Sequence, residues 1–471
     1  MHFNVLWTDA LLYLLIIGGI AFLFWARTQA HLRIAWHDVT RNRLAMVAAV
    51  IFFSYLLIAL LDSIHFQYIT NDRQSYVSES VLDYLISPLG QQDEKTYSAP
   101  FATHLYSKDI VKLANGSIVQ DYPRLEYGGR DLITGSAGGS PAKNRITDIL
   151  QRSAIATLQA SAMWLVIAAI IIFALALHRQ KSFLHMLTEI LHDQTKTAWR
   201  AILLTFGLVL LVSWNALALS HAYHILGTDK IGHDMFYQSL KSIRTGFIIG
   251  TLTTLVIAPL AVFLGMLAGY FRGWIDDVVQ YLYTTLSSVP DVLLIAASIL
   301  ALQLFIAKHA AAFPNIAERA DIRLLALCLI LGITSWTSLC RLLRAETLKL
   351  RELDYVQAAN ALGSSSTRIL VQHILPNLLH LILIALVMDF SGLVLAEAVL
   401  TYVGVGVDPS TVSWGNIINS ARLELARDPV VWWPLASAFI FMFVLVISAN
   451  LFADALRDAL DPRVHSREKG I

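Results

Sequence analysis

Long apolar runs separated by short polar stretches dominate the chain. Nine of these runs approach the roughly 20 residues that a helix needs to cross about 30 Å of hydrocarbon. They cover residues 5–26, 44–62, 154–177, 200–221, 245–270, 276–305, 323–343, 378–403 and 433–456. The pattern therefore predicts an all-α polytopic membrane protein with about nine transmembrane helices.

The polar segment from Arg344 to Pro376 interrupts the apolar pattern with a helical period of its own. A stripe of mostly small residues recurs in it at intervals that place them on one helical face. The stripe consists of Tyr355, Ala358, Ala359 and Leu362. We expect Gly363 to end this short helix and the serines at 364–366 to supply capping oxygens for a second one. The segment therefore predicts a pair of short helices, a helical device that lies on one membrane face.

Basic residues gather in alternate loops, at 27–43, 179–200, 344–368 and 457–469. Cytoplasmic loops carry an excess of Lys and Arg, so these four loops are expected on the cytoplasmic side. The N-terminus is then extracytoplasmic and the C-terminus cytoplasmic, as an odd number of spans also requires.

The same topology places residues 63–153 outside the cytoplasm. Turn-forming residues are frequent there, among them Gly128, Gly129, Gly135, Gly138, Gly139 and Pro141, and they predict a small, loop-rich extracytoplasmic domain. An Asn115-Gly116 pair between two strand-like pieces predicts a β-hairpin. The chain thus divides into two spans in 1–62, an inserted domain in 63–153, two additional spans in 154–221 and a core in 222–463.

Composition supports a membrane location. Only 15% of the 471 residues are charged and 56% are hydrophobic, whereas soluble domains carry about 25% charged residues. A formal net charge of +1 gives no indication of nucleic-acid binding. Cys328 and Cys340 lie roughly 18 Å apart on a helix, too far for a disulfide, and are interpreted as packing residues.

Three carboxylates fall in or near predicted spans. Asp389 lies roughly 16 Å into its span, where a charge is costly; either it faces a water-filled path or a partner subunit, or it is satisfied within the helix bundle. Asp291 follows Pro290, which breaks the backbone hydrogen bonding of a helix, and it either lines the pathway or marks that break. Glu397 either lines an outer gate or caps the turn after Tyr402.

A short polar turn precedes the fifth span. It contains Leu226, Gly227, Thr228 and Asp229, followed by Gly232 and Asp234. Glycine and aspartate favour a tight turn that opens a helix, because a short carboxylate accepts hydrogen bonds from the first backbone N–H groups.

Sequence motifs for chemistry are absent. His178, His185 and His192 recur every seven residues, but no cysteine or carboxylate cluster joins them, so no metal site is expected. No G-x-x-x-x-G-K-[ST] phosphate loop occurs, and no nucleophile and base pair stands out. We expect the chain to perform no enzymatic reaction.

Two patterns occur together in the polar segment. Gln357-Ala358-Ala359 is followed by Gly363, and His373-Ile374-Leu375-Pro376 comes at its end. They resemble the coupling loop of the permease subunits of ABC importers, usually written EAA…G…I.LP. Gln357 stands where the family usually has Glu, and His373 where many members have Ile.

The second half of the chain, from about His224 to Arg463, resembles the "C" permease of dipeptide and oligopeptide ABC transporters. The motifs that carry this resemblance are His224–Asp234, Leu267–Trp274, Leu395–Ala398, Ser413–Asn416 and Leu456–Arg463, together with Arg41–Ala45 at the family's entry into its first span. The resemblance implies a type I importer permease core with five spans in 245–456 and one more helix, for which 44–62 is favoured. It does not account for the additional helices or for residues 63–153.

The resemblance also implies a set of partners. They are a homologous second permease subunit, two ATP-binding subunits, an extracytoplasmic substrate-binding protein and the lipid of a bacterial inner membrane. ATP and Mg²⁺ would be bound by the ATPase subunits, and this chain would carry no cofactor. The loop 344–377 would couple the chain to the ATPases.

The residues expected to take part in coupling are Arg344, Glu346, Tyr355, Gln357, Ala358, Ala359, Gly363, Leu375 and Pro376. Because Gln357 carries no charge, contact with the ATPase is expected to rest on Arg344, Glu346 and Arg351 and on the small-residue stripe. Gln357→Glu is expected to be tolerated.

Two alternatives remain open from the sequence. A channel or secondary transporter would move its substrate without ATPases. A membrane sensor would use 63–153 as its receptor but would need a cytoplasmic signalling domain.

Overall fold

The computed structural model describes residues 2–3, 6–28, 30–69, 76–90, 92–112, 118–130, 132, 144–309 and 316–460. Three predicted features lie outside these residues: the Asn115-Gly116 turn, the stretch from Gly135 to Pro141, and the basic tail after Leu460.

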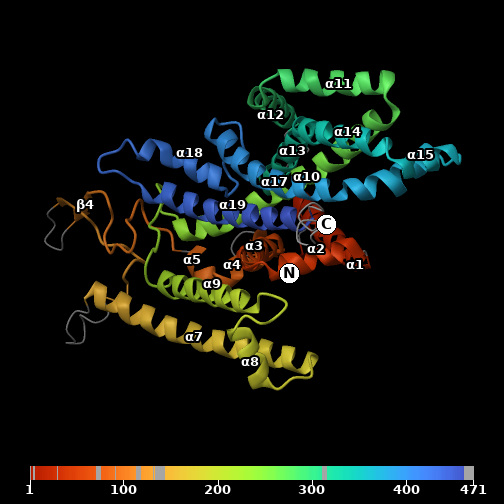
Figure 1. The fold of residues 1–471 in the computed structure, drawn as a ribbon. Coiled ribbons are helices and arrows are strands. Elements are labelled where there is room, and N and C mark those ends of the chain that lie inside the picture. Colours follow the sequence, from red (N-terminus) through yellow and green to blue (C-terminus); the bar gives the residue numbers. More distant parts are fainter. Residues whose placement is uncertain are drawn as a thin grey trace. The chain divides into compact units, whose positions relative to one another are not determined.

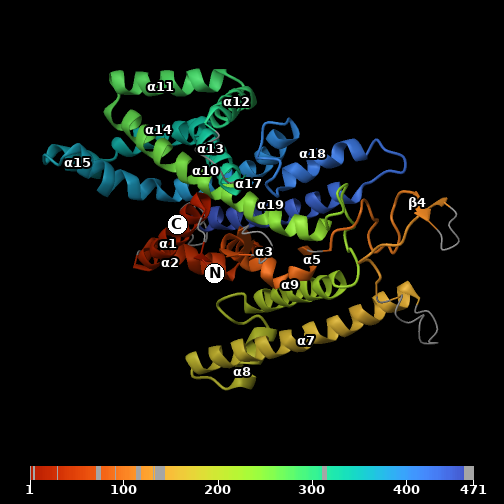
Figure 2. The ribbon, with the colours of Figure 1, turned by 180° about the vertical axis from the view of Figure 1, so that it is seen from behind.

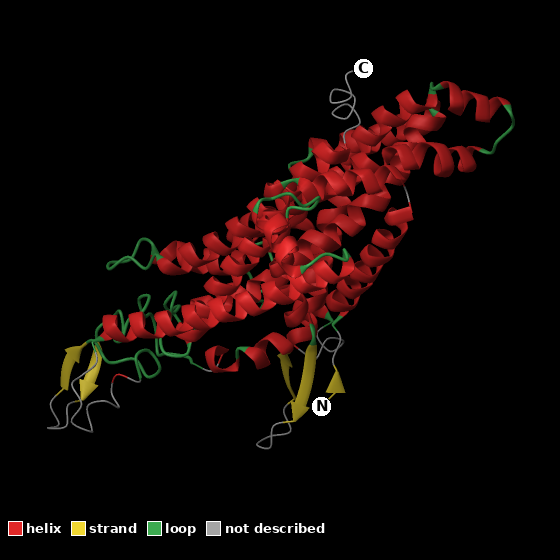
Figure 3. Ribbon diagram, turned by 60° about the horizontal axis from the view of Figure 1, so that its bottom comes forward, coloured by secondary structure: helices red, strands yellow, loops and turns green. Residues whose placement is uncertain are grey.

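Helices make up most of the described chain (Figure 3). They are α1 (Trp7–Thr28), α2 (Ala30–Arg41), α3 (Arg43–Ser63), α4 (Val81–Leu85), α5 (Ser87–Gly90), α7 (Arg145–His178), α8 (Phe183–Leu191), α9 (Trp199–Ser220), α10 (Met235–Phe271), α11 (Gly273–Ser288), α12 (Asp291–Lys308), α13 (Ile316–Ser335), α14 (Thr337–Arg351), α15 (Asp354–Ala361), α16 (Ser366–Ile369), α17 (Leu375–Tyr402), α18 (Trp414–Glu424) and α19 (Trp433–Leu460). A π-helical turn, Leu370–Ile374, joins α16 to α17.

Within the described residues, five short strands form two antiparallel sheets (Figure 3). The first contains β1 (His2–Phe3), β2 (His65–Ile69) and β3 (Tyr76–Ser80), and the second contains β4 (Asp109–Lys112) and β5 (Ile118–Asp121). In the second sheet Asp109 pairs with Asp121 and Lys112 with Ile118. The two strands of the predicted hairpin are therefore present and paired.

The mostly helical, multi-span character is confirmed, but the count of nine spans is not. Among the described residues, seven helices are long and apolar enough to cross a membrane, or eight if a bent pair is counted as one span. The predicted first span forms α1, whose apolar part Trp7–Ala21 is shorter than a full crossing.

The sixth predicted span, 276–305, is wrong as a single helix. The chain breaks between α11 and α12 at Val289 and Pro290, both outside a helix. Proline disfavours the helical conformation of the residue before it, and Val289 is accordingly extended with φ −92° and ψ 132°. The seventh predicted span is also divided, because α13 and α14 meet at a bend of 41°.

The chain divides into two compact units. The first comprises Met1–Asn4, Thr40–Arg244 and Val412–Ser448, and the second comprises Val5–Val39, Thr245–Thr411 and Ala449–Ile471.

In the first unit, α9 packs between α7 and α3 (Figure 1; Figure 2). Gly207 allows α7 to approach closely, since a Cβ there would lie 2.5 Å from the indole nitrogen of Trp164. The Trp164 indole also donates a 2.8 Å hydrogen bond to the carbonyl of Leu203. Near the other end of the pair, Asn215 bonds the hydroxyls of Ser153 and Thr157, so polar contacts fix the two helices at both ends.

In the second unit, the core lies among α10, α14, the π-helical turn and α17. Its most buried side chains include Cys340, Leu343, Ile374 and Leu378. Both cysteines, Cys328 and Cys340, are buried and free, as predicted. The N-terminus of α1 is fastened to α13, because Asp321 accepts hydrogen bonds from the backbone of Trp7 and the hydroxyl of Thr8.

Candidate functional site

The predicted helical device forms as two short helices, α15 and α16, after the end of α14. Gly363 ends α15 with φ +76°, a conformation that side chains other than glycine adopt reluctantly. The N–H groups of Gly363 and Ser364 donate to the carbonyls of Asn360 and Ala359 at 3.0 and 3.1 Å, which is the hydrogen-bond pattern of a Schellman motif. The predicted helix end is therefore confirmed.

The predicted role of the serines is wrong in one respect. Ser365 occupies the N-cap position of α16, but its hydroxyl makes no capping hydrogen bond. Packing anchors α16 through its last residue, Ile369, which is fully buried.

The two short helices are anchored through their apolar side chains. Val356 of α15 is 2% exposed and Ile369 of α16 is 0% exposed, and both join the core that contains Leu343 and Ile374. Close-packed cores resist deformation, so a force on these helices is transmitted to α14 and α17.

The opposite face of the same helices is open. Tyr355 and Leu362 are 44% and 86% exposed, and Gln357, Ala358 and Gly363 are exposed as well. A Cβ placed on Gly363 would meet no atom within 4 Å. Tyr355 is held in place, because its hydroxyl accepts a 3.2 Å hydrogen bond from the amide of Asn377.

The remaining predicted coupling residues lie around this face. Ala359 and Leu375 are partly buried against the core, whereas Pro376 is exposed. Glu346 accepts a 2.7 Å hydrogen bond from Lys349, one turn along α14. Gln357 donates toward the carbonyl and carboxylate of Glu352 at 3.3 and 3.4 Å, so a carboxylate already lies beside the uncharged position.

Ion pairs hold α14 against the preceding helices. Arg344 forms a bidentate pair with Asp276 of α11, with N–O distances of 2.5 and 2.7 Å. Arg351 donates to the carbonyl of Tyr270 at 2.7 Å, and Arg272 pairs with Glu352 at 2.7 Å. The guanidinium of Arg344 is thus engaged within the chain, which suits a role in positioning α14.

Sequence reasoning missed Asp276 as a functional residue. Its signal was an acidic pair, Asp276 and Asp277, at the start of an apolar run. A carboxylate in such a place requires a partner, and the basic residues of α14 were the candidates.

The polar turn 226–229 is tied to residues far away in the sequence. Thr228 is fully buried; its hydroxyl accepts from the N–H of Ser98 at 2.7 Å and donates to the carbonyl of Thr96 at 2.9 Å. Gly227 has φ +70°, and a Cβ there would lie 2.4 Å from the carbonyl oxygen of Ser98. The indole of Trp433, at the start of α19, donates to the carbonyl of Thr228 at 2.9 Å.

Both aspartates of the turn accept backbone hydrogen bonds, as predicted. Asp229 accepts from Ile231 and His233, each at 2.9 Å. Asp234 accepts from Phe236 and Tyr237 at 2.8 and 3.0 Å and so caps the start of α10. The turn is therefore a rigid entry into α10.

A buried charge cluster lies under this turn. His224 bonds Asp234 through Nδ1 at 2.7 Å and Glu94 through Nε2 at 3.4 Å, and the three side chains are 1–3% exposed. Glu94 also accepts backbone hydrogen bonds from Glu126, Tyr127 and Gly128. No local pattern points to Glu94, because its partner His224 is 130 residues away.

The cluster shifts the pKa of its members. Burial lowers the pKa of His224, but its hydrogen bonds to Asp234 and Glu94 outweigh burial and raise the pKa to about 9. Burial raises the pKa of Glu94, but the hydrogen bonds from His224 and from three backbone N–H groups outweigh this and hold the pKa below its ordinary value.

The attachment of Glu94 to the turn should weaken in alkaline solution. Because the pKa of His224 is raised from 6.5 to about 9, its contribution to stability is fully present below about 6.5 and is lost as the pH rises through about 9. This weakening can be measured by limited proteolysis of the full chain in detergent at pH about 7 and about 10. We expect faster cleavage in residues 92–130 at the higher pH. His224→Gln should lack the pH dependence. Equal cleavage of the unaltered chain at both pH values contradicts the prediction.

The three carboxylates predicted as pathway candidates have different surroundings. Asp291 is exposed in the first turn of α12. Glu397 is 2% exposed and accepts a 2.9 Å hydrogen bond from Thr401, one turn further along α17. Asp389 lies midway along α17, is partly exposed, and has no hydrogen-bond or ion-pair partner among the residues that the structure describes.

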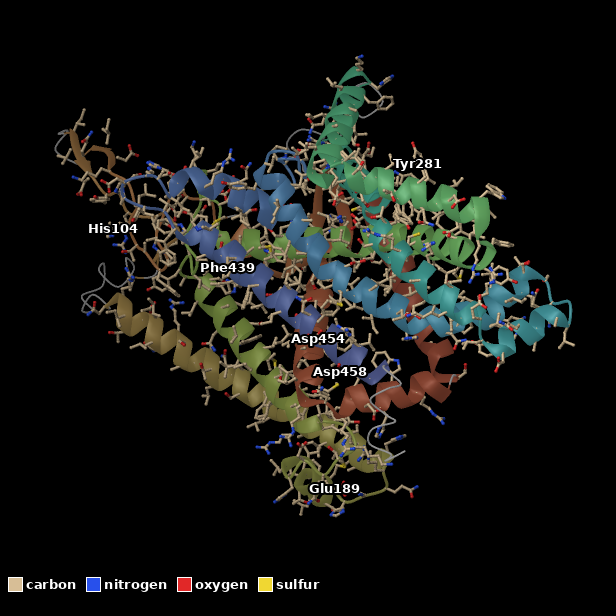
Figure 4. The ribbon with its side chains drawn as sticks, turned by 45° about the horizontal axis from the view of Figure 1, so that its top comes forward. His104, Glu189, Tyr281, Phe439, Asp454 and Asp458 are labelled. Carbon is tan, nitrogen blue, oxygen red and sulfur yellow. The ribbon has the colours of Figure 1, made fainter. Side chains whose placement is uncertain are left out.

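The histidine-rich loop adds no metal ligand set. Within the described residues, no group of three or more His, Cys, Asp or Glu side chains is arranged to hold a metal ion. His185 lies 3.2 Å from Glu189 at α8, and Lys181 pairs with the same carboxylate (Figure 4).

The long apolar helices define a multi-pass membrane protein. Residues 261–466 match the family model described as binding-protein-dependent transport system inner membrane component. The chain is 33% identical over 248 residues to the oligopeptide transport system permease protein OppC of Mycobacterium tuberculosis, covering 53% of this chain and 79% of that protein. It is 30% identical over 244 residues to the glutathione transport system permease protein GsiD of Pectobacterium atrosepticum, covering 52% and 74%.

A third relative is the dipeptide transport system permease protein DppC of Lactococcus lactis, 30% identical over 240 residues, which cover 51% of this chain and 64% of that protein. The chain belongs to the family of binding-protein-dependent transport system inner membrane components. The predicted resemblance to the "C" permeases of dipeptide and oligopeptide transporters is confirmed.

Proposed function

We propose that this chain is one of two transmembrane subunits of an ATP-driven ABC importer for peptides. The observation that carries the proposal is the α15–α16 hairpin, whose apolar side is buried in the core and whose small-residue side is open. A rigid peg of this kind suits insertion into a groove on a partner, because small residues allow close approach. The names of these relatives, as oligopeptide, glutathione and dipeptide permeases, support peptides as the substrate class.

The proposed mechanism is alternating access. Two partner ATPases bind and hydrolyse ATP, and their closure pushes on α15 and α16. The buried Val356 and Ile369 pass this displacement to α14 and α17, while the Arg344–Asp276 pair makes α11 follow α14. The spans then tilt between inward-open and outward-open states.

The proposal includes the orientation of the chain. The N-terminus and residues 63–153 lie outside the cytoplasm, and the α15–α16 hairpin lies inside it. A substrate-binding protein delivers peptide at the outer face, a homologous permease supplies the other half of the pathway, and Asp389 and Glu397 are candidates for its lining.

Co-purification of the tagged chain from its native membrane tests this proposal. We expect recovery of a second permease and two ATPase subunits, with ATP hydrolysis stimulated by the binding protein. A chain that purifies alone and conducts ions or protons would favour a secondary transporter or channel. A stable association with a signalling protein would favour a sensor.

A further inference from the structure

Residues 92–112 and 118–130, here called the clamp segment, lie outside the matched family region and are held by two separate elements of the first unit (Figure 1). One is the loop that enters α10, and the other is the connection between α18 and α19. The connection before α19 lies within the matched region 261–466, whereas the clamp segment and the loop that enters α10 precede it.

The contacts with the loop entering α10 are mostly backbone hydrogen bonds. The backbone N–H of Glu94 donates to the carbonyl of Gly232 at 3.0 Å. The N–H of Phe101 donates to the carbonyl of His224 at 2.9 Å, and the N–H of Gly129 donates to that of Ala222 at 2.8 Å. The Thr228 and Ser98 side chains add a 3.1 Å contact between their hydroxyl oxygens. These bonds surround the buried Glu94–His224–Asp234 cluster.

The contacts with the connection before α19 are aromatic and polar. The ring of Tyr106 packs edge-on against Trp433 with a centroid separation of 4.8 Å, and its hydroxyl donates to the carbonyl of Val430 at 3.2 Å. Arg427 lies over the ring of Tyr97, 5.2 Å from its centroid. Since Trp433 also bonds the carbonyl of Thr228, the clamp segment closes over a direct contact between the loop that enters α10 and the start of α19.

Opening this arrangement would be costly. It would separate the buried carboxylate of Glu94 from the buried imidazole of His224, and it would break the backbone hydrogen bonds that join the clamp segment to the loop. Segments that act as mobile lids instead make weakly packed, solvent-exposed contacts. The cluster at the base of the clamp segment therefore favours a permanent attachment.

We infer that the clamp segment fastens the N-terminal ends of α10 and α19 to each other throughout the transport cycle, with Glu94 and His224 as its positioning residues. This role rests on the proposed function. The two helix ends move as one body, and the outer face opens elsewhere, against the second permease subunit. The segment is neither a lid nor a passive addition.

A reversible disulfide distinguishes a clamp from a lid. The side-chain oxygens of Ser98 and Thr228 are 3.1 Å apart. The sulfur atoms of cysteines at these two positions would therefore lie near enough to form a disulfide, whose S–S bond is roughly 2.05 Å long. The chain's own cysteines, Cys328 and Cys340, are buried and leave a clean background. The S98C/T228C variant is studied in the full transporter with the two single variants as controls.

We expect the oxidised double variant to import substrate within about twofold of the reduced protein, because no step of the cycle requires these residues to separate. A loss of uptake of about tenfold on oxidation, restored by a reductant, would show a lid and overturn the inference. Failure of the disulfide to form in the folded protein would overturn it as well.

A second comparison distinguishes a clamp from a passive addition. Glu94→Gln removes the buried charge, and Glu126→Gln is the matched control because that neighbouring carboxylate is exposed. Glu94→Gln should lower uptake and speed proteolysis of the clamp segment, while Glu126→Gln should do neither. Unchanged uptake in Glu94→Gln would overturn the inference.

These outcomes are separable from failure of the proposed function. If the unaltered complex shows no ATP-dependent uptake, the importer proposal fails. Formation of the disulfide and the proteolysis pattern still report whether the clamp segment is permanently attached.

Discussion

Gly363→Trp is expected to reduce substrate uptake at least about tenfold while the chain still folds and still binds its ATPases. A Cβ at this position meets no atom of the described residues within 4 Å, so the indole is expected to project from the open face of α15 and α16 toward a partner. It should prevent close seating of the hairpin, and ATP hydrolysis should then continue without transport.

Gly363→Ala is the matched control for this experiment. It shares the backbone strain of φ +76°, which costs roughly 1 kcal/mol for a residue with a Cβ, but it adds almost no bulk. Uptake and ATPase activity measured on both variants in the same vesicles separate strain from obstruction. Undiminished transport by Gly363→Trp would remove the coupling role from the hairpin.

Gly232→Ala is expected to release the clamp segment from the loop that enters α10. With φ +94°, a Cβ at this position would lie 1.7 Å from the carbonyl oxygen of Glu94 and 2.4 Å from its carbon. Both atoms are backbone, so the clash is relieved only by moving Glu94 away from His224. Overpacking and strain of this kind cost roughly 3 kcal/mol, which corresponds to a change of about 100-fold in an equilibrium constant.

Thermal unfolding and limited proteolysis of the purified full chain measure this effect. Gly273→Ala is the matched control, because Gly273 also has a positive φ of +59° but open space around its Cβ position. We expect a lower melting temperature and cleavage within 92–130 for Gly232→Ala only. Equal behaviour of the two variants would contradict the close contact between Gly232 and Glu94.

Features with a local cause were predicted well from the sequence. Gly363 ends α15 because a left-handed residue must follow the last helical turn. Asp229 and Asp234 accept backbone hydrogen bonds because short carboxylates next to a turn reach the nearest N–H groups. The long apolar runs became helices because the hydrocarbon interior leaves the backbone no other partner.

Two predictions about helix boundaries failed. The run 276–305 divides into α11 and α12 at Pro290, a local signal that the prediction of a single span did not use. Ser365 occupies the N-cap position of α16 without the predicted hydroxyl hydrogen bond. A capping signal shows where a helix starts but not which contact holds that start.

Long-range pairs were beyond the sequence. Asp276 and Arg344 are 68 residues apart, and Glu94 and His224 are 130 residues apart. No periodic pattern relates such positions, since their proximity results from the packing of several helices. These pairs nevertheless give the candidate sites their rigidity.

The most direct test of the central claim is uptake of labelled peptide into proteoliposomes that contain this chain, its partner permease and both ATPases. With the binding protein outside and ATP supplied to the ATPase side, we predict accumulation that ceases when ATP, the ATPases or the binding protein is omitted. Uptake that persists without the ATPases and follows an imposed proton gradient would contradict the account.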